Sequence, residues 1–398
     1  MATKKSSLRA VPGTVWALGF VSMFMDISSE MIHALLPIYM VTVLGTSVLA
    51  VGIIEGIAEA TASVVKVFSG ALSDRLGKRK LLAALGYGLG ALSKPVFPLA
   101  GTLAWLVGAR FVDRIGKGIR GAPRDALVAD ATPADLRGAA YGLRHTLDTI
   151  GAFCGPLLAI GLMWLTASHY QTVFWIAVIP AFLSVAVLLI YVKEPKPVNP
   201  PKTRPAISRA YLKCLGGQYW SVLAVGVIFT LARFSEAFLI LRAGEAGLPA
   251  MWAPIVLVLM GIAFSISAYP AGVLSDQFGR TGILAVGMLC LLAADLILAL
   301  MPGLMGLVIG IVLWGVHMGF TQEVFSALIA DSAPAEFRGT AFGVFHLATG
   351  IALLLASLIA GILWDIYGYQ LTFLTGAIFA LLALSGLGLY RRHFPRVV

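Results

Sequence analysis

Long apolar runs alternate with short polar segments along the whole chain. Twelve such runs can be delimited, at residues 14–42, 48–72, 80–99, 102–126, 139–166, 171–193, 219–242, 250–274, 281–301, 303–329, 339–366 and 370–390. Each is close to or above the roughly 20 residues that an α-helix needs to cross the hydrocarbon core of a bilayer. Because lipid offers no hydrogen bonds, the backbone must satisfy its own polar groups, so the pattern predicts an all-α integral membrane protein with twelve transmembrane helices.

The composition supports a membrane protein and excludes other classes. Of the 398 residues, 59% are hydrophobic and only 12% are charged, whereas soluble domains carry about 25% charged residues. The formal net charge of +10 is spread over short loops, so we expect a lipid bilayer and no nucleic acid as partner. The three cysteines lack metal-binding or disulfide spacing, and no nucleotide-binding loop is present. We therefore expect no cofactor and no resident metal.

The distribution of basic residues among the loops predicts the orientation. Lys and Arg occupy the N-terminal segment, every second loop and the C-terminus, and the alternate loops contain none. Arg242, at the end of the seventh run, is the exception. Since basic loops stay on the cytoplasmic side, both termini are expected in the cytoplasm. The segment 194–218, rich in Pro, Lys and Arg, is expected to be a cytoplasmic linker between six-helix halves at residues 1–193 and 219–398.

Several motifs occur twice at nearly the same spacing. Gly70-Ala71-Leu72-Ser73-Asp74-Arg75-Leu76-Gly77-Lys78-Arg79 closes the second run, and Gly272-Val273-Leu274-Ser275-Asp276-Gln277-Phe278-Gly279-Arg280 closes the eighth. Residues 130–142 are echoed by residues 331–343, an offset of 201. This duplication predicts two six-helix halves related by a parallel pseudo-twofold repeat, which is a transporter architecture.

These motifs resemble the major facilitator superfamily. The signature that the family carries between its second and third helices is matched by Gly70, Asp74, Arg75, Gly77 and Arg79. Residues 114–122 are similar to the Arg-containing segment of the family's fourth helix. Residues 151–159 resemble the Gly-Pro motif of its antiporters, with Gly151, Gly155 and Pro156 in place and Ala159 where the last glycine is expected.

The resemblance implies a proton-coupled secondary transporter in the bacterial cytoplasmic (inner) membrane, similar to exporters of drugs and small molecules. It also implies alternating access and a monomer. The family signature would act as a conformational latch, closing the cytoplasmic helix ends when the cavity faces outward, through Gly70, Asp74, Arg75, Gly77, Arg79, Asp125, Asp130 and Asp276. The alternative is that these charges only fix the topology, and that Gly151, Gly155 and Pro156 are a plain packing motif.

Ionisable residues within the predicted helices are the candidates for chemistry, because each is costly in a bilayer unless it meets a partner or a wet cavity. Asp26 and Glu30 lie on one face of the first helix, near the depth of residues 110–117, so ion pairs between the first and fourth helices are expected. The proton-coupling candidates are Asp26, Glu30, Glu55, Glu59 and Asp148. A static ion network that fixes the fold is the alternative.

The second half is much poorer in charge. At the offset of 201, Arg120 and Arg124 become Thr321 and Phe325. A polar first half combined with an apolar, aromatic second half suits an amphipathic organic substrate. The expected cavity residues are Arg110, Arg114, Lys117, Arg144, His145, Arg233, Glu236, His317, Glu323 and His346.

The functional hypothesis is therefore a proton-coupled antiporter that exports a small amphipathic molecule, drug-like or siderophore-like. A proton symporter that imports an organic anion stays open, because the fourth helix is basic. A divalent metal transporter is a third alternative, although no two intramembrane histidines share ligand spacing on one helix. A sensor would need a larger soluble output segment, and an enzyme would need a nucleophile–base constellation. We expect neither.

Overall fold

The computed structural model describes residues 11–133, 136–194, 215–334 and 338–394. Within these ranges every regular element is a helix and no strand occurs. Contacts divide the chain into a first unit, Met1–Leu36 with Thr61–Arg204, and a second unit, Pro37–Ala60 with Pro205–Val398. The boundary differs from the expected halves at residues 37–60, so the division into six-helix halves stays a prediction.

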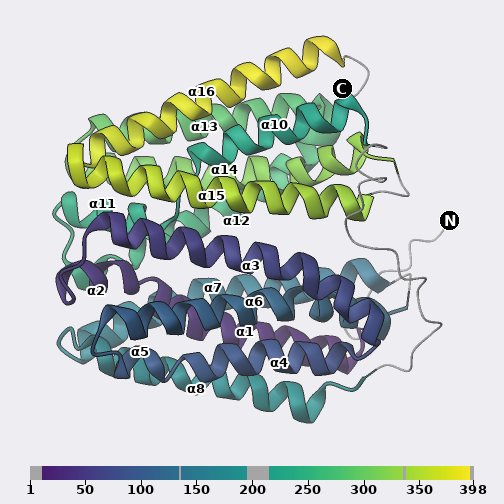
Figure 1. The fold of residues 1–398 in the computed structure, drawn as a ribbon, viewed down its shortest axis with the longest axis vertical. Helices are drawn as coiled ribbons and strands as arrows, with labels where there is room; N and C mark the ends of the chain where they lie inside the picture. Colours follow the sequence, from purple (N-terminus) through teal and green to yellow (C-terminus); the bar gives the residue numbers. More distant parts are fainter. Residues whose placement is uncertain (1–10, 134–135, 195–214, 335–337, 395–398) are drawn as a thin grey trace. The chain divides into compact units, whose positions relative to one another are not determined.

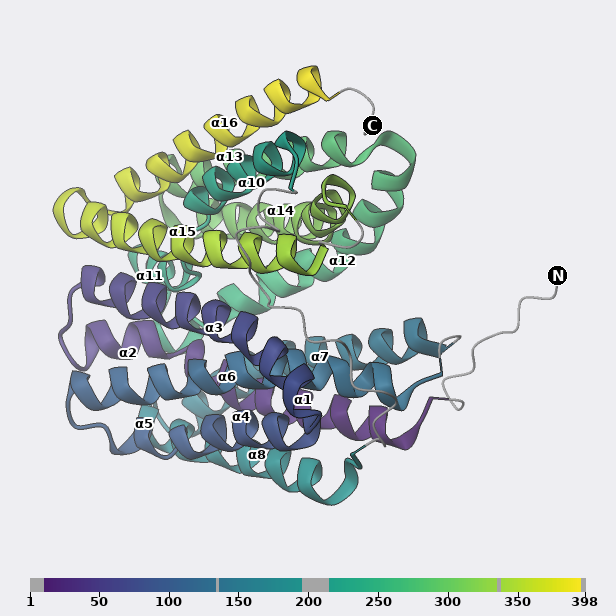
Figure 2. The same ribbon diagram turned by 45° about the vertical axis from the view of Figure 1, so that its right-hand side comes forward.

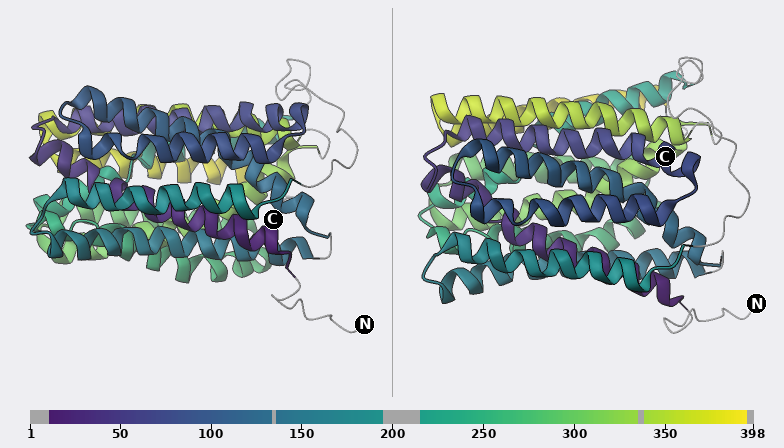
Figure 3. Two further views of the ribbon diagram at one scale, coloured as in Figure 1. Left: turned by 90° about the horizontal axis from the view of Figure 1, so that it is seen from below. Right: turned by 60° about the horizontal axis from the view of Figure 1, so that its bottom comes forward.

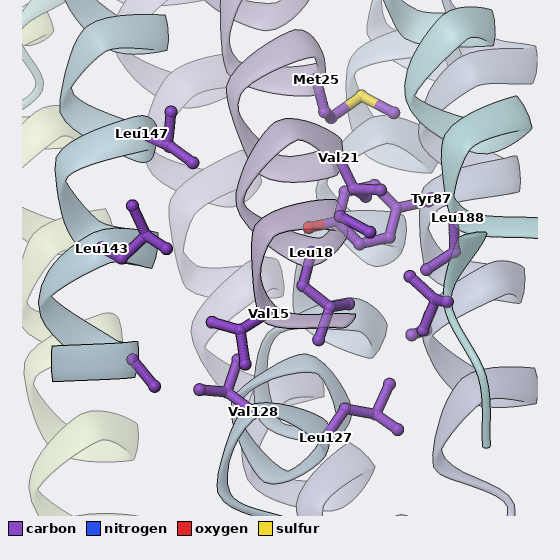
Figure 4. Close-up of a cluster of buried hydrophobic side chains, with 14 of the residues drawn as sticks. Val15, Leu18, Val21, Met25, Tyr87, Leu127, Val128, Leu143, Leu147 and Leu188 are labelled. Atoms are coloured by element: carbon purple, nitrogen blue, oxygen red, sulfur yellow. The ribbon is translucent and has the colours of Figure 1, made fainter. Parts of the chain in front are cut away.

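In the first unit one helix is surrounded by the others. α1 (Gly13–His33) packs against α7 (Arg137–Leu165), α8 (Tyr170–Tyr191) and α6 (Leu103–Ala131), while α4 (Arg79–Ser93) and α5 (Val96–Leu99) pack against α6 and α8 (Figure 1). Figure 4 shows the apolar face of α1 at the centre of this core. The core is built from Val15, Leu18, Val21, Met25, Tyr87, Leu127, Val128, Leu143, Leu147 and Leu188.

The second unit contains the remaining helices. They are α2 (Leu36–Thr42), the first part of α3 (Val48–Leu76), α10 (Gly217–Ala232), α11 (Ala237–Glu245), a short 3-10 helix (Ala250–Trp252), α12 (Ile255–Phe278), α13 (Arg280–Leu300), α14 (Gly303–Ser332), α15 (Arg338–Tyr367) and α16 (Tyr369–His393). α14 packs between α12 and α13, and α16 packs on α10, α13 and α15 (Figure 2).

Glycines and a helix cap explain why the first part of α3 belongs to the second unit. The Asp365 carboxylate of α15 accepts hydrogen bonds from the backbone N–H groups of Val48 and Leu49, each at 3.0 Å, and so caps the N-terminus of α3. Gly52 lies against the backbone of Ser357, where an added Cβ would approach the carbonyl oxygen to 2.4 Å. Contacts this close hold α3 on α15 without intervening side chains.

Each of the twelve predicted runs coincides with one helix or with two consecutive helical segments, which run lengthwise within their units (Figure 3). Four runs are interrupted in the described structure, at Ala34–Leu35, at Lys94–Pro95, at residues 233–236 and at Ala253–Pro254. In the described part of the chain, ten segments are long and apolar enough to cross a membrane. The runs 80–99 and 102–126 are not among them, because α4 stops before Pro95 and α6 carries charges along its length.

Arg242, the basic residue on the wrong side of the charge pattern, has a structural role. It is fully buried. Its Nε donates to the carbonyl of Leu298 at 3.0 Å and its Nη2 to that of Met301 at 3.1 Å, while the guanidinium lies 4.0 Å from the centre of the Tyr369 ring. Arg242 therefore caps the carbonyl end of α13, which accounts for a basic residue at that position.

Candidate functional site

One ion pair occurs at equivalent places in both units. In the first unit Arg79, which begins α4, pairs with Asp130 near the end of α6 and also donates to the carbonyl of Ala126 at 3.2 Å. In the second unit Arg280, which begins α13, pairs with Asp331 near the end of α14 and donates to the carbonyl of Ala327 at 2.6 Å. Each pair ties the end of one helix to the start of another, and the two pairs are related by the offset of 201.

The other expected latch residues are only partly described. Gly77 ends α3 with a left-handed φ of 61°, a conformation that favours glycine, and an added Cβ at Gly70 would lie 3.3 Å from that of Ala122. The side chains of Asp74, Arg75 and Asp276 lie outside the described part of the structure. Asp125 pairs with Arg124 at 3.1 Å and Arg144 at 3.7 Å, and so belongs to a different cluster.

A buried lysine that the sequence interpretation overlooked holds one carboxylate in the first unit. Lys94 is 1% exposed, and its Nζ donates to Asp113 at 2.9 Å and to Ser29 at 3.0 Å. The Asp113 carboxylate also lies 4.0 Å from Arg110 and 4.0 Å from Arg114, both buried. Asp113 is thus one anion among three cations, and it ties α6 to α4 and, through Lys94, to α1.

One ion pair of the described residues joins α1 to α6. Asp26 lies 3.9 Å from Arg120, three residues past the predicted partners at 110–117. The Arg120 guanidinium stacks over the ring of Tyr87, with its Cζ 4.8 Å from the ring centre. The carboxylate of Glu30 contacts His33 of its own helix, at 3.4 Å. Arg114 and Lys117 are electrostatic neighbours of Glu30.

Asp148 extends the cluster onto α7. It pairs with Arg144 at 2.6 Å and lies 3.9 Å from Arg124. Arg124 also donates to Ser22 of α1 at 3.0 Å, and the Ser22 hydroxyl is 3.0 Å from that of Tyr87. These contacts form a carboxylate–arginine network over α1, α6 and α7, which we define as Asp26, Asp125 and Asp148 with Arg120, Arg124 and Arg144.

The glycines of the Gly-Pro motif lie against α1, next to the residues of this network. A Cβ at Gly151 would lie 2.6 Å from the carbonyl oxygen of Met23 and 3.1 Å from the Cβ of Asp26, and one at Gly155 would lie 2.6 Å from the Cβ of Glu30. The two glycines are four residues apart and therefore share one face of α7. They let α7 approach the turns of α1 that carry Asp26 and Glu30. Pro156 is buried within α7, next to this contact.

The remaining first-unit candidates, Lys117 and His145, are exposed. In the second unit Glu55 is buried and Glu59 half-buried on α3. Arg233 and Glu236 are the first and last residues of the break between α10 and α11 and are electrostatic neighbours.

His317 is buried between Trp314 and Phe229, with ring centres 5.3 and 6.1 Å away. His346 is exposed and stacks on Phe342 at 6.2 Å. The side chain of Glu323 is not among those described.

Aromatic rings in the second unit occupy the places of the arginine network. Phe325 and Phe345, the counterparts of Arg124 and Arg144 at the offset of 201, stack with ring centres 6.3 Å apart. Phe229 stacks on Phe325 at 5.6 Å. Among the described residues, no group of three or more His, Cys, Asp or Glu is placed to hold a metal ion.

Comparison with known proteins now identifies the family. The model of the Major Facilitator Superfamily matches residues 18–325 and 255–397, two overlapping matches that together span nearly the whole chain. The chain belongs to the major facilitator superfamily. An uncharacterized MFS-type transporter of Methanocaldococcus jannaschii is 33% identical over 387 residues, which cover 95% of this chain and 94% of that protein.

Two further matches agree. The inner membrane transport protein YajR of Escherichia coli is 24% identical over 390 residues, covering 94% of this chain and 81% of that protein. The crystal structure of a mutant of the nucleoside transporter NupG superposes with a TM-score of 0.80 at 13% identity, covering 95% of this chain and 99% of that one. The family resemblance drawn from the motifs is confirmed, and the fold is that of transporters, not enzymes.

The cluster around Asp113 predicts that substitution of Asp113 destabilises the protein more than substitution of Lys94. Asp113→Asn removes the anion that three buried cations share, whereas Lys94→Met removes one cation of three. Removing one partner of a buried pair costs about 3–5 kcal/mol. We expect Asp113→Asn to lower the melting temperature in detergent more than Lys94→Met, and Lys94→Met to recover part of the loss in the double variant. Lys193→Met, at an exposed lysine, is the control. A larger loss for Lys94→Met would contradict the assignment.

The close contact of α7 with α1 predicts a matched pair of glycine substitutions. Gly155→Ala would push its Cβ into that of Glu30, whereas Gly161→Ala, on the same helix, meets nothing within 4 Å. Since alanine favours helices over glycine by about 1 kcal/mol, we expect Gly161→Ala to preserve or raise the melting temperature and Gly155→Ala to lower it. Equal effects of the two changes would show that α7 does not depend on this approach.

Proposed function

We propose that this chain is a proton-coupled secondary transporter, an alternating-access antiporter that exports a small amphipathic organic molecule. Membership of the family gives transport. The sequence contains no nucleotide-binding loop, so a gradient is the natural driving force. The observation that carries proton coupling is the carboxylate–arginine network, in which three carboxylates share three arginines inside helices long enough to span a bilayer.

The contacts of Asp26 and Asp148 suit a proton switch. Asp26 meets Arg120 at 3.9 Å, near the limit of an ion pair, and Asp148 meets Arg124 at the same distance. Protonation of a carboxylate cancels its attraction for arginine. A proton taken up from water by Asp26 would release Arg120, and loss of the proton would restore the contact. A conformational change that makes or breaks these contacts therefore changes the affinity for protons.

The interiors of the two units differ in chemistry. The first unit contains the arginine network and the exposed Lys117, and the second contains the stacked rings of Phe229 and Phe325, both buried, and of the half-buried Phe345. This combination supports an amphipathic substrate. An exposed lysine on a basic helix favours a negatively charged group, which keeps import of an organic anion by proton symport as the second candidate.

We also propose the finer architecture. The chain would form twelve transmembrane helices in two parallel six-helix repeats, residues 1–193 and 219–398, and act as a monomer with both termini in the cytoplasm. The equivalent pairs Arg79–Asp130 and Arg280–Asp331 support the repeat. The name of the Escherichia coli relative supports an inner-membrane location.

Thermal stabilisation of the purified protein tests the substrate class. Ethidium, benzoate, a catecholate siderophore and Mn²⁺ would be compared at pH 6 and pH 8, because a ligand that binds only the folded state raises the melting temperature. We expect an organic ligand to stabilise more at pH 8, where fewer protons compete with it. A larger effect of benzoate at pH 6 would favour symport, and a response to Mn²⁺ alone would contradict an organic substrate.

Substitution of the α1 carboxylates tests coupling, with the ligand found by this comparison as the transported probe. We expect Asp26→Asn or Glu30→Gln to abolish uptake driven by a pH gradient in vesicles while leaving counterflow of the ligand largely intact, because counterflow needs no proton. Glu245→Gln, at an exposed carboxylate, is the control. Loss of both activities together would instead assign these residues to a structural ion pair or to substrate contact.

A further inference from the structure

Asp295 is a buried carboxyl group without a partner among the described residues. It lies on α13, its exposed fraction is 0%, and neither carboxyl oxygen has a hydrogen-bond partner in the described part of the chain. No ion pair of the described residues includes it. An ionised carboxylate in such surroundings costs several kcal/mol, so the group requires either a proton or a partner.

The repeat explains how this situation arises. At the offset of 201, Asp295 takes the position of Lys94, and Trp314 takes the position of Asp113. In the first unit these positions hold the buried pair of Lys94 with Asp113. In the second unit the charge of the first position is reversed and the second is an indole ring. Asp295 is therefore at the site of a buried charge pair whose other member is absent.

The surroundings of Asp295 are apolar and aromatic. A Cβ at Gly376 of α16 would lie 2.6 Å from Oδ2 of Asp295 and 3.2 Å from the ring of Phe234. Phe234 in turn packs on Trp314 and Phe373, with ring centres 5.5 and 5.3 Å away. Glycine at position 376 thus leaves the room that the carboxyl group fills, and Phe234 lies beside it.

Titratable groups on the neighbouring elements are engaged elsewhere. On α14 the ring of His317 packs between Trp314 and Phe229. Arg242 of α11 donates to the carbonyls that end α13. The other such groups on α10, α11 and α16 and in the break between α10 and α11 are Tyr219, Arg233, Glu236, Glu245, Tyr369, Tyr390, Arg391, Arg392 and His393, and α13 itself carries Cys290. None of these described groups donates a hydrogen bond to the Asp295 carboxyl. The side chains of Asp276 on α12 and Glu323 on α14 are not described.

Phe234 lies at a break in the helix. α10 ends at Ala232 and α11 begins at Ala237. Within the break the backbone N–H of Ser235 donates to the Ser357 hydroxyl at 3.2 Å, and that of Ala237 donates to the Ser235 hydroxyl at 3.3 Å. Discontinuous helices typically form the substrate and ion sites of secondary transporters. A change at this break would move Phe234 and expose Asp295 to water.

We propose that Asp295 is a proton-binding site of the second unit, covered by Phe234 and opened at the break between α10 and α11. Asp295 holds a proton while it is covered, exchanges it with water when Phe234 moves, and regains it before closure. This inference rests on the proposed function, since a proton site of this kind serves a proton-coupled cycle.

Infrared spectroscopy tests the site without a substrate. The protein in lipid vesicles at pH 7 should show the carbonyl band of a buried carboxylic acid, and Asp295→Asn, which has nearly the same shape and no charge, should lack it. Glu245→Gln should retain it. On transfer to D₂O the band should shift as the acid proton exchanges, and Phe234→Leu or Phe234→Ala should shift it faster. The leucine variant keeps most of the packing if the alanine variant does not fold.

Two results would overturn the proposal. A wild-type spectrum identical to that of Asp295→Asn would show that Asp295 is ionised. A band that never shifts in D₂O, in the wild type or in the Phe234 variants, would show that its proton does not exchange and that the acid only fills space. Transport that is independent of the pH gradient would contradict the proposed function, whereas an exchanging band would still establish the proton site.

Discussion

The cost of holding charge inside membrane-length helices governs this protein. A charge at bilayer depth must be paired, stacked or neutral, and the two units meet this condition differently. The first unit pairs its charges, as in Lys94 with Asp113 and in the carboxylate–arginine network. The second unit replaces them with rings, so that Phe325 stacks on Phe345 where the first has arginines. Equivalent positions in the two units therefore form a charged interior in the first and an aromatic interior in the second.

The close helix contacts and the charges depend on each other. Gly151 and Gly155 bring α7 onto the turns of α1 that carry Asp26 and Glu30, and the arginines of α6 then reach the same region. A wider spacing between α1 and α7 would separate Asp26, the α1 member of the network, from Arg144 and Asp148 on α7. The packing motif and the candidate coupling residues are thus parts of one arrangement, which links a feature of helix packing to the proposed proton coupling.

The sequence predicted the helices well, because an apolar run long enough to cross a bilayer must form a helix to satisfy its backbone hydrogen bonds. It did not predict the breaks, as at residues 233–236, because the segment Arg233-Phe234-Ser235-Glu236 contains no Gly or Pro to mark a helix end. Lys94 was missed because a single lysine hardly changes the hydropathy of its run. Partners were harder still: helical spacing placed Asp26 and Glu30 on one face, but which cation each meets depends on the depth and rotation of α6. Asp26 therefore meets Arg120, and Glu30 meets His33.

The central claim, that substrate movement is coupled to proton movement in the opposite direction, is tested most directly by the internal pH of vesicles that contain the protein and a trapped pH-sensitive dye. With no imposed gradient, adding a ligand that stabilises the protein to the outside should drive the ligand inward and protons outward, so that the interior becomes more alkaline. Vesicles without protein set the baseline. Entry of the ligand with no change of internal pH, or with acidification, would contradict antiport.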